Sequence, residues 1–272
     1  TKLSLYTHMK IKILTVVAAA LAISASSTLA QTTIWYDNFE GYANQAALDA
    51  VYTQLYPATP LPLDTTQGHK SPQSIHSGIH ANYENRMYLN LPGGPITGTD
   101  VQPIKLEFRV NTDVNNWWTR EYIELRSYEN GAYGDGALQE LLALGFTSSG
   151  VDTTLINQRI TFAGDTGWGN LTGTYADRAT IAAVPTYGLW TKLGMVIKSS
   201  TIEYYVNDNL DTTKNIGSGI YFDSLLIGSG LSTGVDVWFD NLSLQVVPEP
   251  STFALGLVGG LGLLCLLRRR MA

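Results

Sequence analysis

Acidic side chains are the residues in this sequence whose spacing is most easily tested for catalysis. A retaining glycoside hydrolase needs two carboxyl groups ~5–5.5 Å apart. Glu121 and Glu124 are three residues apart on an expected strand, so they point to opposite faces of it. Glu107 and Glu124 could face each other across neighbouring strands, but basic residues alternate with both of them. We therefore expect a salt-bridged polar face and predict no catalytic residue.

Aromatic residues give the candidate ligand site. Trp118 follows an Asn-Asn turn and precedes an expected strand that carries Tyr122 on its polar face. Trp168 falls in a glycine-rich stretch, residues 164–169, which we expect to be a loop. An aromatic ring on a loop either stacks on a ligand or plugs the end of a sandwich. We predict that Trp118, Tyr122 and Trp168 contact a sugar ligand.

The elements that must position these residues are short strands. Apolar residues recur with period two, and Gly, Asn, Asp and Pro clusters separate the runs. The one helical pattern is weak and covers Asn44–Leu55, where Asn44 is an expected N-cap. The expected strands are 103–110, 120–128, 141–147, 154–162, 189–198, 201–206, 222–228 and 235–246. This pattern predicts an all-β sandwich.

Three segments narrow the fold further. Residues 188–209 give a strand led by Trp190, a two-residue turn and an aromatic strand. This resembles the hairpin of laminin-G-like and concanavalin A-like jelly rolls, and 224–230 with 237–244 resembles their closing strands. The opening stretch, 36–42, is similar to the first strand of many exported proteins. The resemblance implies a concanavalin A-like jelly-roll β-sandwich over residues 31–246. Galactose-binding-like modules have similar end strands, so that topology stays open.

This resemblance also implies a metal site. The first and last strands of a jelly roll commonly lie side by side, which would bring Asp37 and Glu40 near Asp240. Oxygen ligands from turn-rich backbone suit Ca²⁺, which takes about 6–8 of them. We therefore expect a structural Ca²⁺ held by Asp37, Glu40 and Asp240. The alternative is that these acids are solvated or cap turns.

The start of the chain has the layout of a secretory signal peptide. Residues 1–8 precede Met9 and are expected to be an over-extended N-terminus. Residues 9–30 then give a basic start, an apolar centre and a small-residue region. We expect export by the Sec machinery and cleavage between Ala30 and Gln31.

The end of the chain, residues 247–272, has three ordered parts. Pro248, Glu249 and Pro250 precede an apolar run at 253–267, and Arg268, Arg269 and Arg270 follow that run. The run predicts a short transmembrane helix, below the roughly 20 residues that span a bilayer comfortably. The arginines would keep their end in the cytoplasm.

This tail resembles the PEP-CTERM sorting signal of exopolysaccharide-producing Gram-negative bacteria. In that family a membrane protease, the exosortase, reads and removes the tail. The resemblance implies a transient stay in the inner membrane, followed by the cell surface or extracellular matrix.

The composition of the part expected to be exported limits the partners it can bind. Residues 31–247 carry 11 Lys and Arg against 22 Asp and Glu, a formal charge of −11, which repels nucleic acid and anionic lipid. The one cysteine, Cys265, lies in the apolar tail, so no disulfide supports this part. We expect a non-catalytic protein that binds or organises extracellular polysaccharide. Two alternatives remain: a glycan-degrading enzyme using Glu107 and Glu124, or a purely structural matrix protein.

Overall fold

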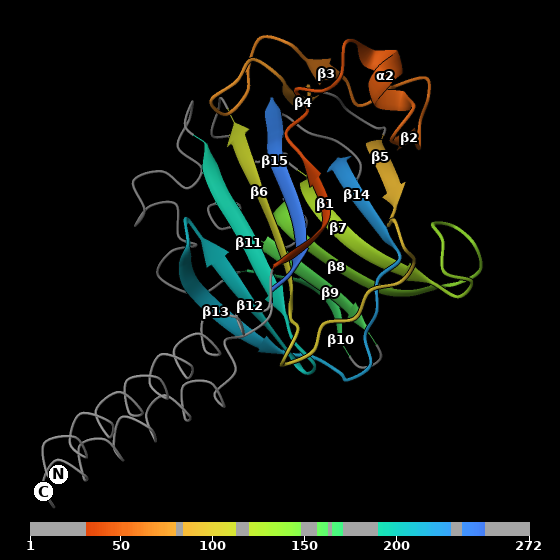
Figure 1. The fold of residues 1–272 in the computed structure, drawn as a ribbon, viewed down its shortest axis with the longest axis vertical. Helices are drawn as coiled ribbons and strands as arrows, with labels where there is room; N and C mark the ends of the chain where they lie inside the picture. Colours follow the sequence, from red (N-terminus) through yellow and green to blue (C-terminus); the bar gives the residue numbers. More distant parts are fainter. Residues whose placement is uncertain are drawn as a thin grey trace, which may run out of the picture. The chain divides into compact units, whose positions relative to one another are not determined.

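Two antiparallel β-sheets and one short helix make up the part of the chain that the structure describes (Figure 1). In this computed structural model the described residues are 31–79, 84–112, 120–147, 157–162, 165–170, 190–229 and 236–247. Residues Thr32–Val246 form one compact unit. The predicted all-β fold class is confirmed.

Sheet A contains the first and last strands of the chain. Its strands are β1 (Thr32–Asp37), β3 (Leu63–Asp64), β4 (Ser74–Ser77), β6 (Ile104–Thr112), β11 (Thr191–Ile197), β12 (Thr201–Val206), β13 (Asn209–Asn215) and β15 (Val237–Val246). Their order is β13-β12-β11-β6-β15-β4-β3, and β1 also pairs with β15.

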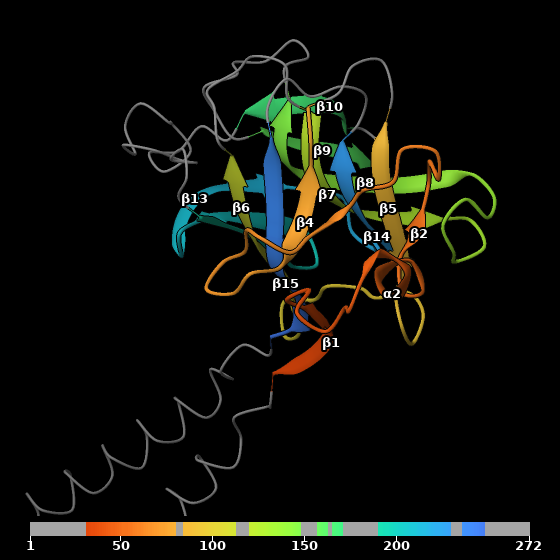
Figure 2. The same ribbon diagram turned by 90° about the horizontal axis from the view of Figure 1, so that it is seen from above.

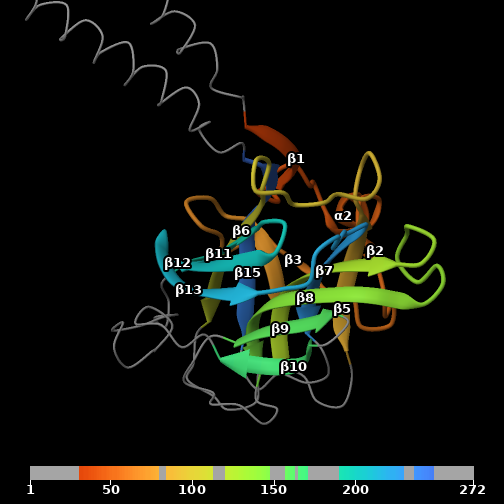
Figure 3. The ribbon, with the colours of Figure 1, turned by 90° about the horizontal axis from the view of Figure 1, so that it is seen from below.

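Sheet B contains the middle strands. They are β2 (Thr53–Gln54), β5 (Asn85–Asn90), β7 (Arg120–Tyr128), β8 (Leu138–Thr147), β9 (Asn157–Phe162), β10 (Asp165–Asn170) and β14 (Ser224–Ser229). Their order is β10-β9-β8-β7-β14-β5-β2, and Figure 3 shows β7 to β10 following one another across the sheet.

The connections give the sandwich its jelly-roll arrangement. The chain passes from sheet to sheet along β4, β5, β6 and β7, and again along β13, β14 and β15. Strand β1 lies beside β15, with Asp37 opposite Leu242 (Figure 2). The first and last strands are therefore neighbours, as the resemblance implied.

Period-two alternation explains why these residues form strands. On β6, Leu106 and Phe108 are fully buried, whereas Glu107 and Arg109, which alternate with them, lie on the outer face. Ile123 of β7 and Leu225 of β14 join the same core cluster from sheet B. Full burial of each such side chain contributes roughly 1.5–3 kcal/mol. Together they hold the two sheets face to face.

Two local predictions differ from the structure. The helical pattern at 44–55 gives only a short helix, α2 (Gln45–Asp49), because Tyr52 beyond it turns into the core. The predicted cap is present, since the Asn44 side chain accepts a hydrogen bond from the Ala47 amide at 3.0 Å. The turn at Asn207 and Asp208 has positive φ at both residues, 49° and 66°, and leads directly into β13, which the sequence reading missed.

A carboxyl group is buried at one end of the core. Glu121 is fully buried, and its Oε1 accepts a hydrogen bond from the Ser77 hydroxyl at 2.8 Å. Its Oε2 has no hydrogen-bond partner among the described residues. Burial raises the pKa of Glu121 to about 8, although Ser77, Ser229 and the charge of Arg86 oppose this. The side chain is therefore mostly protonated in the folded chain at neutral pH.

Glu121 should make stability depend on pH. From its ordinary pKa of 4.5 up to about 8, the unfolded chain ionises this group while the folded chain keeps it neutral. Stability from this group is therefore greatest below pH 4.5 and is lost as pH rises to 8. Glu121→Gln should raise the free energy of unfolding at pH 8 by on the order of 2 kcal/mol and change it little at pH 4.5. Urea unfolding across this range measures the effect. The exposed Glu129→Gln serves as control, and parallel profiles for E121Q and the parent chain would contradict the assignment.

Candidate functional site

The carboxyl pair considered for catalysis is not a pair in the structure. Glu107 lies on β6 in sheet A, whereas Glu124 lies on β7 in sheet B. Both point away from the core, so they occupy opposite outer faces of the sandwich. The expectation that they face each other across neighbouring strands is wrong, because β6 and β7 are consecutive strands in different sheets.

Each of these acids does lie in a salt-bridged polar face, as expected. Glu107 accepts ion pairs from Lys105 at 2.8 Å and Lys192 at 2.7 Å. Glu121, three residues before Glu124, points into the core as its spacing predicted.

Strand register places two of the predicted ligand residues on the outer face of sheet B. Trp168 lies opposite Arg159, and that row continues through Ala143 to Glu124. Tyr122 is two residues from Glu124, on the same face, and is buried. Trp168 is part of strand β10 rather than a loop, which corrects the sequence reading. Trp118 lies outside the described residues.

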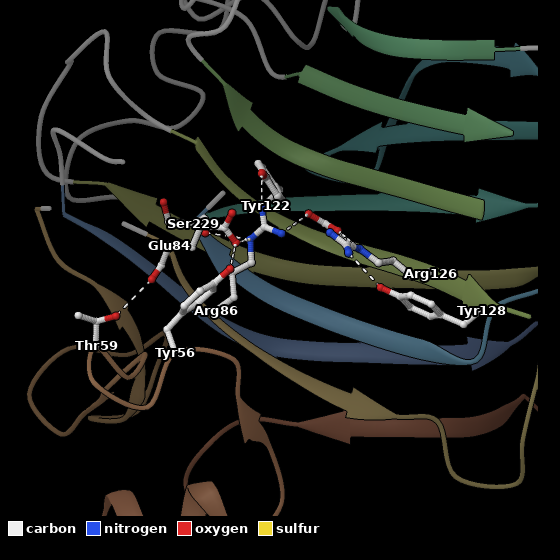
Figure 4. Close-up of polar contacts among 9 residues, drawn as sticks. Tyr56, Thr59, Glu84, Arg86, Tyr122, Arg126, Tyr128 and Ser229 are labelled. Atoms are coloured by element: carbon white, nitrogen blue, oxygen red, sulfur yellow. Dashed lines mark hydrogen bonds and ion pairs between the residues drawn. The ribbon is translucent and has the colours of Figure 1, made fainter. Parts of the chain in front are cut away.

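A buried ion-pair network occupies the middle of this face (Figure 4). Glu124 is 2% exposed and pairs with Arg126 through Oε2 and with Arg86 at 3.9 Å through Oε1. Arg86 donates to the Tyr122 hydroxyl at 2.8 Å, and Arg126 donates to the Tyr128 hydroxyl at 3.1 Å.

The charged groups of this network stabilise one another in their ionised forms. Burial alone would lower the pKa of Arg126, but Glu124 raises it overall, and the same two causes act on Arg86. Both guanidinium groups therefore stay charged and hold a fixed orientation. Removing one partner of such a buried pair typically costs 3–5 kcal/mol.

The solvent-accessible part of the outer face of sheet B begins at a tyrosine on the β7–β8 loop, residues 129–137. Tyr133 is half-buried and stacks on Tyr88 of β5, with ring centres 4.2 Å apart and an interplanar angle of 23°. Its amide donates to the Asn90 side chain at 2.9 Å, which ties the loop to β5. The Arg126 guanidinium lies 5.8 Å from the Tyr133 ring centre. The loop therefore holds an aromatic ring against the charged network.

The same surface continues along β5. Tyr56 is 40% exposed and donates to Glu84 at 2.8 Å, and Glu84 lies 3.6 Å from Arg86 (Figure 4). We call Tyr56, Glu84, Arg86, Tyr88 and Tyr133 the β5 strip. It combines aromatic rings with planar charged groups held in place by hydrogen bonds. Such a surface can stack on the apolar face of a ring and exchange hydrogen bonds with its polar substituents.

Sequence reasoning missed the four members of this strip that precede β6. The signal was present, because Arg86, Tyr88 and Asn90 alternate with Met87 and Leu89. That segment has no alternating run between turn residues that is long enough to predict a strand. The residues on its outer face were therefore not predicted as a site.

Asp37, Glu40 and Asp240 gather where β1 meets β15. Asp37 accepts hydrogen bonds from the Tyr52 hydroxyl at 3.0 Å and the Phe39 amide at 2.7 Å. Asp240 is fully buried and accepts from two backbone amides at 2.6 Å. Burial raises the pKa of Asp240 to about 6, and the negative charges of Glu40 and Asp37 add to this. The three acids are thus close enough to repel one another.

These acids do not form a ready metal site. Over the described ranges, no group of three or more His, Cys, Asp or Glu side chains is arranged to hold a metal ion. The hydrogen bonds above match the alternative reading, in which the acids cap turns. The structural Ca²⁺ remains a prediction.

Both terminal segments lie outside the described residues, apart from Gln31 at the expected signal cleavage site and Val247. They include Ala30, Pro248–Pro250, the expected helix at 253–267 and Arg268–Arg270. In the portion of the chain that is described, no helix is long and apolar enough to cross a membrane.

Comparison with known proteins bears on the fold. No protein-family model matches this sequence, and no curated protein matches it. The chain is similar in structure to the botulinum neurotoxin serotype D binding domain, with 9% identity and a TM-score of 0.50. That match covers 84% of this chain and 51% of the other, so this chain spans about half the length of the toxin structure.

Two further structures are similar over most of their length. One is a Bacillus subtilis protein of unknown function with a galectin-like fold, at 10% identity and a TM-score of 0.49, covering 80% of this chain and 98% of that one. The other is the carbohydrate recognition domain of Emp47p, at 8% identity and a TM-score of 0.44, covering 80% and 97%. At these identities the likeness concerns the fold alone.

Calcium should stabilise the chain if the corner formed by Asp37, Glu40 and Asp240 holds the ion. In that case added Ca²⁺ should raise the Tm at pH 7 and a chelator should reverse the rise, because a bound cation relieves repulsion among the three acids. Thermal unfolding with and without chelator measures this, with Asp240→Asn as the insensitive variant. An unchanged Tm with chelator, together with a higher Tm at pH 5, would show that protonation rather than calcium relieves the repulsion.

Proposed function

We propose that this chain is a non-catalytic protein that binds extracellular polysaccharide through the β5 strip. The observation that carries the proposal is the contiguous surface from Tyr56 through Glu84 and Arg86 to the stacked pair of Tyr88 and Tyr133. Sugars present apolar ring faces and many hydroxyl groups. A surface that offers both aromatic rings and fixed donors and acceptors suits that chemistry.

The buried network supports this proposal by holding the strip rigid. Arg86 is fixed by the Tyr122 hydroxyl, the Ser229 carbonyl and two glutamates. A side chain already ordered in the free protein loses little entropy when a ligand binds. The separation of Glu107 from Glu124 removes the carboxyl pair on which the enzymatic alternative depended.

The terminal motifs support export. We propose that Sec carries the chain out, that cleavage after Ala30 frees the domain, and that an exosortase removes the tail after reading Pro248–Pro250. The mature protein then resides at the cell surface or in the extracellular matrix. The absence of cysteine from residues 31–247 is compatible with this, since the core needs no disulfide.

Polysaccharide binding should depend on the stacked tyrosines. Tyr133→Ala and Tyr88→Ala should each weaken binding on a glycan array about tenfold, because each removes a stacking face worth roughly 1 kcal/mol or more. Leu138→Ala, an exposed apolar residue at the start of β8, is the control and should bind normally. Release of reducing sugar from the bound glycan, or undiminished binding by both tyrosine variants, would count against the proposal.

Tail processing should depend on positive charge. Replacing Arg268, Arg269 and Arg270 by glutamine should leave the chain uncut, because the tail loses the charges that hold its end in the cytoplasm. Immunoblotting of fractionated cells distinguishes cut from uncut chain. Lysine at the same three positions keeps the charge and should restore processing. Normal processing of the glutamine variant would exclude a sorting role for the arginines.

A further inference from the structure

An open pocket lies on the outer face of sheet A, across the sandwich from the β5 strip. Its volume is about 410 Å³, within the range of ~300–1,000 Å³ usual for small-molecule sites. Arg109 of β6, Lys192 of β11 and Asn241 of β15 line it, together with His69 and Lys70 from the β3–β4 loop. The carboxylate of Glu107 also lines it, so the pocket combines three cationic side chains with one acid and several neutral hydrogen-bonding groups.

A bulge in β15 builds this pocket. The register between β15 and β6 shifts between Asp240 and Ser243, and Asn241 takes a positive φ of 50°. Asp240 beneath the bulge accepts from the His69 amide at 2.6 Å, which ties the β3–β4 loop to the strand. The Asn241 side-chain amide lies 3.0 Å from Nδ1 of His69 and fixes that ring. The wall of the pocket is thus held by the same residues that line it.

Charge is unbalanced within the pocket. Lys105 and Lys192 neutralise Glu107, and Lys192 also pairs with Asp208 at 2.6 Å. Arg109 forms no ion pair with any residue that the structure describes. Burial lowers the pKa of His69, and the charges of Arg109 and Lys70 lower it further, so the ring is neutral at pH 7. Among the described residues no acid lies within ion-pair distance of this half-buried guanidinium, although its charge helps to lower the pKa of Asp208, so it leaves a place for an external anion.

An exposed aromatic ring stands at the rim. Tyr36 of β1 is 54% exposed, and its hydroxyl donates to Oδ1 of Asn241 at 3.4 Å. Register places Tyr36 opposite Ser243, which lines the pocket and lies opposite Glu107. An exposed tyrosine ring beside polar amide and hydroxyl groups suits a sugar ring better than a bare inorganic ion.

We propose that this pocket binds one acidic sugar residue of the hexuronic acid class. Its carboxylate lies on the Arg109 guanidinium, its hydroxyls meet Asn241 and Ser243, and one face of its ring packs on Tyr36. This second site does not rest on glycan binding by the β5 strip, which lies on the other sheet.

Calorimetric titration of the purified full chain tests the pocket with three probes: D-glucuronate, D-glucose and inorganic sulfate. Glucuronate should bind saturably and glucose at least tenfold more weakly, because only glucuronate carries the carboxylate. Arg109→Gln should weaken glucuronate at least tenfold. Tyr36→Ala should weaken glucuronate and leave sulfate unchanged, since sulfate has no ring to stack.

Lys214→Gln is the matched control, because it removes one positive charge from the same sheet away from the pocket. It should bind glucuronate normally. Equal affinity for glucuronate and glucose would overturn the proposal, as would undiminished glucuronate binding by Arg109→Gln. If thermal unfolding shows that Arg109→Gln does not fold, the exposed Tyr36→Ala decides. Sulfate binding as tight as glucuronate, with no effect of Tyr36→Ala, would reduce the site to a simple anion site and overturn the sugar assignment.

Discussion

Pairing by the last strand holds this sandwich together. Strand β15 pairs with β6 along most of its length, and its other edge is divided between β4 and β1. Leu242 and Leu244 on its inner face belong to the common core. Sheet A therefore cannot be completed until the residues at 237–246 have been made. Contacts between such distant parts of the chain are slow to form, so we expect folding only after this strand leaves the ribosome or the export channel.

The bulge in β15 connects this core strand with the pocket on the outer face of sheet A. Asp240 and Asn241 interrupt the regular ladder, and their side chains hold the β3–β4 loop beside β6. Bulges commonly re-aim side chains near functional sites. Here the interruption places Asn241 in the wall of the pocket that Arg109 also lines.

The arginine side chains on the two outer faces differ in their interaction partners. On sheet B, Arg86 and Arg126 share Glu124, each also donates to a tyrosine hydroxyl, and Arg86 donates to the Ser229 carbonyl. On sheet A, Lys105 and Lys192 pair with Glu107, and Lys192 also pairs with Asp208. Within the described part of the chain, the arginines of sheet B are therefore ion-paired, whereas Arg109 of sheet A is not.

Alternation along single strands made much of the fold predictable. The strands expected at 103–110, 120–128, 189–198 and 201–206 are all present, the first and third with slightly different ends, because apolar side chains on one face leave little choice of conformation. Alternation along a strand does not predict which other strands it pairs with. Glu107 and Glu124 lie on consecutive strands, and only the crossing from one sheet to the other separates them. The β5 strip could not be predicted for the same reason, because Tyr133 contacts Tyr88 from a loop that lies more than forty residues later in the chain.

The pairing of Thr32 with Val246 has a consequence for engineering. Residues opposite each other in an antiparallel ladder are only ~4.5–5.5 Å apart at their α-carbons. A linker of a few residues can therefore close this domain into a ring, and the β7–β8 loop offers a place to reopen it. Such a circular permutant keeps every ladder of the sandwich while moving both ends to a new edge, where a fusion partner can be attached without touching β1.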